Sequence, residues 1–335
     1  MTKKKKFQQL FSKGSLDDEI LFRPILMHFA ARYIGKSYKE FASDYKTLVE
    51  SNLRCLEDFD LDAVGLISDP YRETSAFGAK ITFPDEAVPR CEELIIKTLE
   101  DVKLLKNPDV YKAQRTLDRI NAAKLLYREV GNEVPVIGWV EGPLAEACDL
   151  AGINEVLLNL LINPDFVKLL MEKTTITAMD FAKAQIGAGC DIIGVGDAIC
   201  SQISQESYKE FVKDKHAELF DYIQGQGAKV KLHICGNISH LLADLKQTRP
   251  DIVDIDHMVN MDEAYYVLGP EIVRCGNIDP VSVIQNQNEN KIAETVKVLC
   301  KKELGKRFIL SGGCEITVLT PPLNLKAMRD SSRAF

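Results

Sequence analysis

Residues 233 to 237 read HICGN and place a histidine and a cysteine two positions apart, at the end of an alternating run that is typical of a β-strand. Side chains two apart on an extended segment point to the same side, so His233 and Cys235 can reach one ion. Cys314 follows Gly312 and Gly313, where the lack of side chains allows close approach. Imidazole and thiolate suit a borderline-soft ion such as Zn²⁺, and three protein ligands leave the open position of a catalytic site.

These residue types also have a purely structural interpretation. His233 can form hydrogen bonds in a core, and Cys235 and Cys314 can act as small apolar side chains. Paired C-x-x-C sequences, which a zinc finger requires, do not occur in the chain. The residues alone therefore leave metal binding and core packing both open.

Eight short apolar runs that are rich in β-branched residues recur along the chain and predict strands. They begin at residues 23, 62, 134, 190, 229, 252, 271 and 307, and segments with helical spacing lie between them. This alternation predicts a mainly parallel sheet, and eight strands predict a (β/α)₈ (TIM) barrel. We expect one domain over 1–335, with an N-terminal helical extension and with 1–60 and 70–130 adding helices or a cap. An open doubly wound sheet is the alternative, but the chain has neither G-x-G-x-x-G after its first strand nor a Walker A sequence.

Reactive groups in a parallel barrel come from the carboxyl ends of the strands, where the following loops meet. A polar residue follows each predicted strand. We expect Glu141 to be catalytic, either as a fourth zinc ligand that substrate displaces or as a proton donor. The residues expected to line the substrate pocket or to orient the zinc ligands are His28, Asp69, Asp197, Asp256 and His257. Each acidic position also suits a helix N-cap or a turn.

Composition excludes several classes of protein. A net charge of −7 leaves no basic surface for nucleic acid. The basic start, MTKKKK, is expected to be a solvated tail, because no apolar stretch of signal-peptide length follows it. Nine cysteines, an odd number, favour reduced thiols, and no apolar run is long enough for a membrane span. The chain is therefore expected to be cytoplasmic.

Three segments carry a resemblance to a known family: HICGN (233–237), SGGCEITVLTPPLNLKAM (311–328) and GWVEGPLAEACDLAG (138–152). With them, and over nearly its whole length, the chain resembles the uroporphyrinogen decarboxylase superfamily, and within it the zinc-dependent corrinoid methyltransferases. The resemblance implies a (β/α)₈ barrel, zinc held by His233, Cys235 and Cys314, and methyl exchange with the cobalt of a corrinoid on a separate protein. The decarboxylases carry an arginine-rich N-terminal signature, which FRPILMHFAARYIGKS (22–37) lacks.

The expected reaction moves a methyl group from a small donor, such as a phenyl methyl ether, to Co(I) of a corrinoid. Glu141 favours this direction, because a leaving oxygen needs a proton and a thiol acceptor does not. The alternatives are a methylcobamide:thiol methyltransferase, with a thiol like coenzyme M, and a decarboxylase-like enzyme. The chain lacks the D-x-H-x-x-G sequence that supplies a cobalt-ligating histidine, so a corrinoid-binding partner protein is expected to bring the cofactor.

Overall fold

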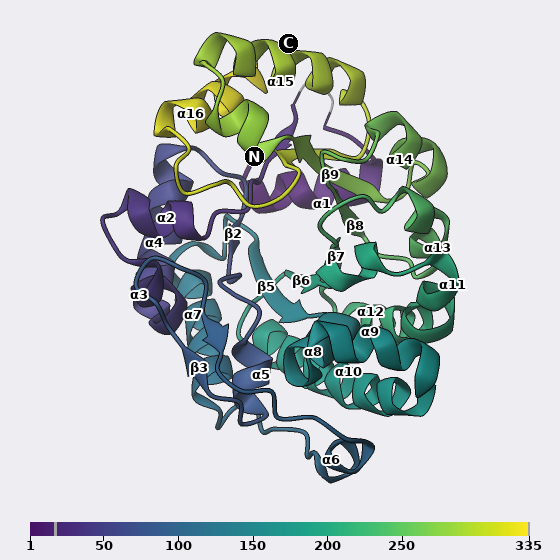
Figure 1. Cartoon of the computed structure of the whole chain (residues 1–335). Coiled ribbons are helices and arrows are strands. Elements are labelled where there is room, and N and C mark those ends of the chain that lie inside the picture. Colours follow the sequence, from purple (N-terminus) through teal and green to yellow (C-terminus); the bar gives the residue numbers. More distant parts are fainter. Residues whose placement is uncertain (17–18, 334–335) are drawn as a thin grey trace.

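Eight parallel strands form one curled sheet in the computed structural model, which describes residues 1–16 and 19–333 (Figure 1). Their order is β1-β10-β9-β8-β7-β6-β5-β2. The strands are β1 (Leu21–Phe22), β2 (Val64–Gly65), β5 (Val136–Glu141), β6 (Ile192–Gly196), β7 (Lys229–His233), β8 (Ile252–Ile255), β9 (Val273–Ile278) and β10 (Phe308–Gly312). Between the edge strands, the N–H of Asp62 donates to the carbonyl oxygen of Phe22 at 2.9 Å, which joins the two edges. The predicted (β/α)₈ barrel is confirmed.

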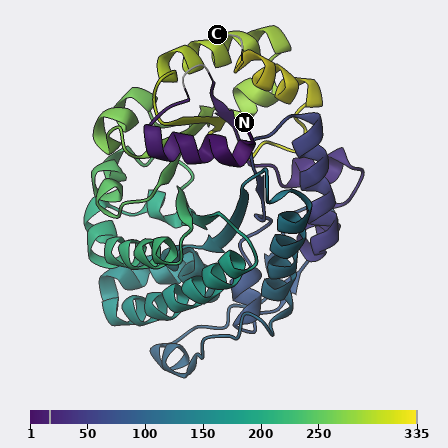
Figure 2. The same cartoon turned by 180° about the vertical axis from the view of Figure 1, so that it is seen from behind.

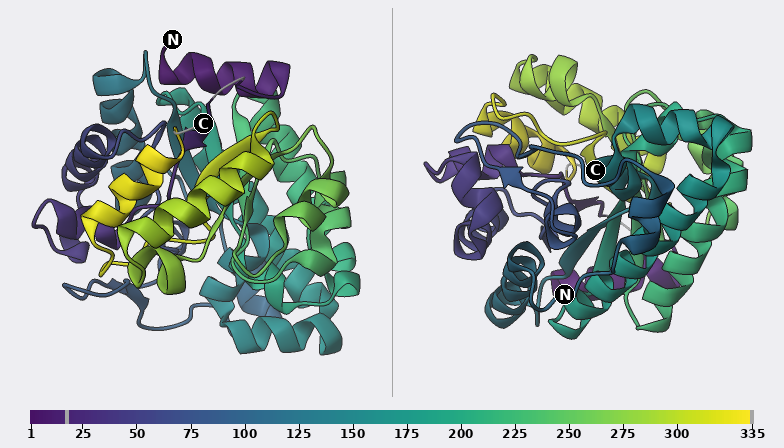
Figure 3. Two further views of the ribbon diagram at one scale, coloured as in Figure 1. Left: turned by 90° about the horizontal axis from the view of Figure 1, so that it is seen from above. Right: turned by 60° about the horizontal axis from the view of Figure 1, so that its bottom comes forward.

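Helices surround the sheet and connect successive strands (Figure 1). They are α1 (Lys3–Lys13), α2 (His28–Tyr33), α3 (Tyr38–Ser43), α4 (Tyr45–Asp58), α5 (Arg72–Ala76), α6 (Leu99–Leu104), α7 (Gln114–Val130), α8 (Pro143–Ala151), α9 (Ile153–Ile162), α10 (Pro164–Gly187), α11 (Gln205–Ser207), α12 (Lys213–Gly225), α13 (Leu242–Gln247), α14 (Met261–Leu268), α15 (Glu289–Glu303) and α16 (Pro322–Ser331). Figure 3 shows α15 and α16 side by side on the outside of the barrel. Among the described residues, no helix is long and apolar enough to cross a membrane.

The N-terminal segment and the long segment after β2 contain the extra helices that the sequence predicted. Residues 1–60 contain α1 to α4, and 70–130 contain α5 to α7 with a small antiparallel pair, β3 (Ile81–Thr82) and β4 (Arg90–Cys91). Helix α7 packs on both α4 and α5. We propose on this basis that the chain is one domain.

The first strand differs from its prediction. The run that begins at residue 23 was expected to be extended, but β1 ends at Phe22 and α2 begins at His28. Arg23 still donates its N–H to Leu310 of β10. Pro24 has no N–H to continue the ladder, so the strand stops there.

The basic N-terminus is a helix and not the solvated tail that its lysines suggested. Helix α1 lies across the amino-terminal end of the barrel, as Figure 2 shows from behind. Phe7 and Leu10 are three residues apart, so they share one face and pack on the first inward-facing residues of the strands. Lys4 forms an ion pair with Asp191 at 2.6 Å, so its charge also helps to hold α1 against the barrel. The helical spacing of the apolar residues outweighs the run of lysines.

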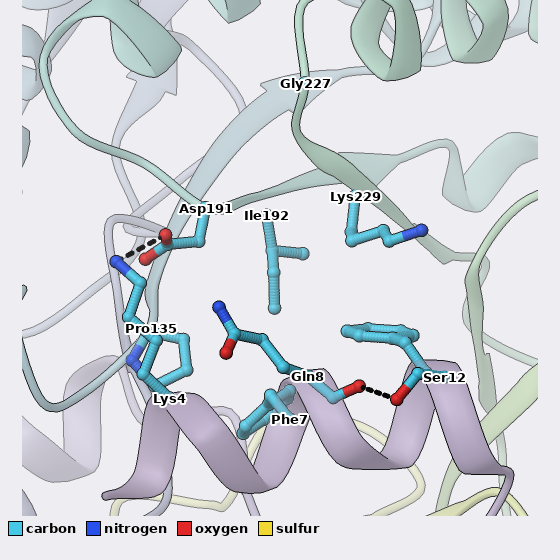
Figure 4. Close-up of a pocket in the computed structure, with 10 residues that line it drawn as sticks. Lys4, Phe7, Gln8, Ser12, Pro135, Asp191, Ile192, Gly227 and Lys229 are labelled. Carbon is cyan, nitrogen blue, oxygen red and sulfur yellow. Dashed lines mark hydrogen bonds and ion pairs between the residues drawn. The ribbon is translucent and has the colours of Figure 1, made fainter.

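A cavity of about 420 Å³ lies between α1 and the barrel rim (Figure 4). Its walls include Phe7 and Phe11 of α1, and Ile192 and Lys229, the first residues of β6 and β7. It therefore opens at the amino-terminal end of the strands, opposite to the end where His233 terminates β7.

Candidate metal centre

The three predicted metal donors meet at the carboxyl-terminal end of the barrel. His233 Nε2 lies 3.0 Å from Cys235 Sγ, which lies 3.2 Å from Cys314 Sγ, and the distance from Cys314 Sγ to His233 Nε2 is 3.9 Å. Donors on a tetrahedral zinc ion, with bonds of about 2.0–2.3 Å, lie about 3.3–3.8 Å from one another. Small shifts would therefore place all three on one ion, and the arrangement fits zinc.

The two thiols and the imidazole are electrostatically coupled. The hydrogen bond from Cys235 lowers the pKa of Cys314 to about 4, so that thiolate forms near neutral pH. The same hydrogen bond, together with burial, raises the pKa of Cys235. Burial disfavours the charged form of His233, but its hydrogen bonds to Asp254 and Cys314 outweigh burial and raise its pKa to about 9. A thiolate is the form of cysteine that binds a metal ion, so the site holds one ligand in its binding form.

Asp256 braces the loop that carries Cys235. Its Oδ2 accepts the N–H of Gly236 at 2.9 Å, and its Oδ1 accepts the N–H of Met258 at 3.0 Å. Gly236 has φ +93°, which favours glycine. On the other side of the site, a Cβ on Gly313 would lie 2.3 Å from the backbone nitrogen of His257. Only glycine there lets the loop that carries Cys314 approach the loop after β8.

Asp254 orients the histidine and was missed by the sequence analysis. Its Oδ2 lies 2.8 Å from His233 Nδ1, which leaves Nε2 free to face the two thiols. Burial alone would raise the pKa of Asp254, but the ammonium of Lys231 and the His233 ring hold it well below its usual value. A carboxylate partner for the imidazole was expected. Asp254 lies two residues before Asp256 on the same strand face, and this spacing is the signal that could have identified it.

Glu141 lies at the end of β5 and is level with His233, since Gly196 of β6 pairs with both residues. Its Oε1 lies 2.6 Å from a terminal nitrogen of Arg72, and its N–H donates to Glu73. Burial raises the pKa of Glu141 well above its usual range, and the Glu73 charge adds to this while Arg72 opposes it. Among the described residues, two groups of donors lie close enough to share one ion: His233 with Cys235 and Cys314, and the fully buried Asp197 with Cys200 and His216. Glu141 belongs to neither group.

Asp69 and Asp197 are buried and hold helices. Both oxygens of Asp69 accept from Arg115 of α7, at 2.9 and 2.6 Å. Asp197 accepts the N–H groups of Leu144 and Ala145 in the first turn of α8. Its Oδ2 also lies 3.0 Å from Nε2 of the buried His216. The carboxylate oxygens of both residues are therefore engaged away from the metal donors.

His28 and His257 contact residues that neighbour the three donors. The His28 ring stacks on Tyr38 with 4.8 Å between ring centroids, and its Nε2 lies 3.1 Å from Glu86. The N–H of His28 donates to Glu315, the residue after Cys314. His257 Nδ1 lies 2.8 Å from Asp256, so this histidine supports the metal loop through a second residue.

Trp139, which sequence reasoning also missed, packs beside the metal donors. Its ring centroid lies 5.9 Å from that of His233. A Cβ on Gly194 would lie 2.2 Å from the indole, and one on Gly196 would lie 3.1 Å from it. The glycines of β6 therefore create the space that the indole fills.

A (β/α)₈ barrel with an imidazole and two thiols at its carboxyl end is the arrangement of a candidate metalloenzyme. Comparisons with known proteins identify the family. The profile of the uroporphyrinogen decarboxylase (URO-D) family matches residues 18–335. The chain belongs to this family, and the predicted superfamily is confirmed.

The relatives carry two kinds of name. A methylcobamide:CoM methyltransferase, MtbA, from Methanosarcina acetivorans is 27% identical over 277 residues, which is 82% of this chain and 80% of the relative. A uroporphyrinogen decarboxylase from Trichlorobacter lovleyi is 26% identical over 323 residues, covering 91% and 92%. A solved methyltransferase from Methanosarcina mazei superposes with a TM-score of 0.90 at 21% identity, covering 99% of this chain and 98% of its own. The fold is thus shared with a methyltransferase along the whole chain.

Proposed function

We propose that the protein is a zinc-dependent methyltransferase that moves a methyl group between a small molecule and the cobalt of a corrinoid on a partner protein. The observation that carries this proposal is the convergence of His233, Cys235 and Cys314, from two distant segments, at the open end of the barrel. Three protein donors leave one position of a tetrahedral ion for a substrate. The relatives named as methylcobamide:CoM methyltransferases support the same chemistry.

A small thiol is the substrate that we favour at the open position. Zinc bound by His233, Cys235 and Cys314 would lower the pKa of such a thiol, so that it reacts as a thiolate. The sulfur would then take the methyl group from methylcobalt, and Co(I) would retain the electron pair of the broken bond. Asp254 holds the histidine ring in position for ligation, and Asp256 holds the loop that carries Cys235. The names of the relatives favour this direction over the one that Glu141 suggested from sequence.

The reverse reaction is a second candidate, and Glu141 is the observation that favours it. Burial and the Glu73 charge raise the pKa of Glu141 while Arg72 opposes this, so the protonated form is favoured relative to an exposed carboxyl group. It could give that proton to a leaving oxygen, for example from a phenyl methyl ether. Glu141→Gln tests this role: it should abolish methyl transfer from a methylated donor and leave transfer to a thiol unchanged.

Decarboxylation is the third candidate, because uroporphyrinogen decarboxylase is the other name that the relatives carry. Two thiols and an imidazole at the mouth of the barrel have no part in a reaction that needs no metal. Activity that persists after chelation would favour decarboxylation.

The test combines metal analysis with cobalamin spectroscopy. We expect about one zinc per chain. Absorbance would follow methylcobalamin with thiols in one direction, and cob(I)alamin with methoxyarenes, methylamines and methanol in the other. His233→Ala and Cys314→Ser should lose zinc and activity together, whereas Cys91→Ser, a thiol on the distant β4, should keep both. Full zinc content in both site variants would refute the proposed centre.

A further inference from the structure

Charged side chains occupy the interior of the barrel directly beneath the metal donors. Lys231 and Asp254 are 3% and 4% exposed and point inward from β7 and β8, two residues below His233 and Asp256. The interior of such barrels is normally filled by branched apolar side chains. A buried ion pair is costly to desolvate and adds little stability by comparison with apolar packing. The pair therefore requires an explanation other than stability.

The contacts of Asp254 connect this pair to the metal donors. One oxygen, Oδ2, accepts from both Lys231 Nζ and His233 Nδ1. The other oxygen, Oδ1, is buried and has no hydrogen-bond partner among the described residues. Lys231 Nζ in turn lies 5.8 Å from the centroid of the Trp139 ring, which packs against His233. Lysine, carboxylate, indole and imidazole thus form one contiguous cluster.

We propose that Lys231 is a positioning residue of the metal centre, whose ammonium holds the shared oxygen of Asp254 on His233 Nδ1 so that Nε2 points at the ion. This inference rests on the zinc centre proposed above. Asp254 alone can accept the imidazole N–H, but removal of Lys231 would take away the cation that holds the shared oxygen in place.

Arg23 is a second buried cation that can compete with His233 for the carboxylate of Asp254, and Lys231 would prevent this competition. Arg23, also buried, projects across the seam between β1 and β2, where a Cβ on Gly65 would lie 2.4 Å from its guanidinium. Its Nε has no hydrogen-bond partner among the described residues. The guanidinium of Arg23 interacts electrostatically with Asp254, so without Lys231 a turn of the carboxylate toward Arg23 would release the imidazole.

The experiment measures metal binding and not turnover. Lys231→Met removes the charge and keeps a long side chain, and Asp254→Asn removes the carboxylate. Loss of a group that orients a ligand typically weakens metal binding by about 10–100-fold, and we expect this for each variant in competition with a chromophoric chelator. The d–d absorption of the Co²⁺-loaded protein should change with it, since the histidine no longer ligates in one orientation. Lys229→Met, on the same strand but solvent-exposed and paired with Asp251, is the matched control and should change neither property.

The double variant Lys231→Met/Asp254→Asn separates positioning from folding, because it leaves neither charge of the pair buried alone. If Lys231 acts through Asp254, the double variant binds zinc as weakly as Asp254→Asn and no more weakly. Wild-type affinity and an unchanged cobalt spectrum in Lys231→Met would overturn the inference while leaving the zinc centre intact. Absence of zinc from the wild-type protein would overturn both.

Discussion

Cys235 and Cys314 lie 3.2 Å apart, Sγ to Sγ, although 79 residues separate them in the chain. Their hydrogen bond divides the pair into one thiol that keeps its proton and one that releases it readily. Other cysteines, such as Cys190 and Cys300, have their pKa values raised chiefly by burial. Cys235 and Cys314 thus differ from these cysteines because each faces another thiol.

Asp69 provides a pH-dependent test at the scale of one residue. Its buried bidentate pair with Arg115 holds its pKa below the usual value even though burial opposes this. Asp69→Asn leaves the arginine charge buried, so we expect a loss of about 3–5 kcal/mol in the free energy of unfolding at pH 7. Because the folded-state pKa is depressed, the contribution of Asp69 is complete above its unfolded pKa of about 4 and declines as the pH falls through the folded value.

Urea unfolding at pH 7 and pH 3 measures this difference, which should be smaller at pH 3. Asp221→Asn is the matched control, because Asp221 also places two oxygens on one arginine, Arg249, but on the surface. Exposed pairs contribute about 0–1 kcal/mol. Equal losses in the two variants would show that burial of the Asp69 pair has no effect.

At the scale of elements, the two glycines of β6 leave room for a side chain that packs beside the candidate metal centre. Gly194 and Gly196 leave its inward face free for the indole of Trp139 on β5, and Trp139 packs on His233 of β7. Three adjacent strands therefore cooperate to hold one ligand. The glycines on the middle strand make this possible, since a Cβ at Gly194 would overlap the indole and one at Gly196 would press tightly against it.

Gly194→Ala should displace Trp139. The added methyl group would lie 2.2 Å from the ring, and overpacking of this kind costs about 1–3 kcal/mol. Trp139 is the only tryptophan, so its fluorescence reports the displacement directly. Gly187→Ala at the end of α10, where a Cβ meets nothing within 4 Å, is the control and should keep both emission and stability. An unchanged spectrum in Gly194→Ala would contradict this account of the site.

At the scale of the whole molecule, the two ends of the barrel have separate tasks. Helix α1 covers the amino-terminal end over an apolar layer, and the metal donors lie at the carboxyl end. Stability and chemistry should therefore be separable by mutation.

Leu10→Ala tests this separation. Leu10 is 1% exposed beneath α1, and such a truncation typically costs about 2–5 kcal/mol. Leu161→Ala on α9, where the side chain is 79% exposed, should change stability by about 0.5 kcal/mol or less. Thermal unfolding measures both, and zinc content measured alongside should remain at the wild-type value. Loss of zinc in folded Leu10→Ala would show that the two ends are coupled.

The local sequence was sufficient to predict the barrel and the three candidate donors. Runs of β-branched residues specify strands through local geometry, and seven of the eight barrel strands among the described residues lie within or overlap the predicted runs. A parallel barrel then brings the strand ends together, so H-x-C on one strand and a late cysteine on another suggested a common site before any contact was known. The strand β1 was misplaced because Pro24 interrupts its run.

Only the tertiary structure decided which polar side chains support the donors. In the sequence, Asp254 and Lys231 look like ordinary strand residues. Their role depends on contacts with each other and with Trp139, which lies nearly a hundred residues before Lys231. Asp69 and Asp197 were predicted to line the pocket or to orient the zinc ligands, and the structure adds that their oxygens accept hydrogen bonds from Arg115 and from the first turn of α8. Burial and charge pairing depend on residues that are far apart in the sequence. Strand formation and the type of donor atom depend on residues that are close together in it.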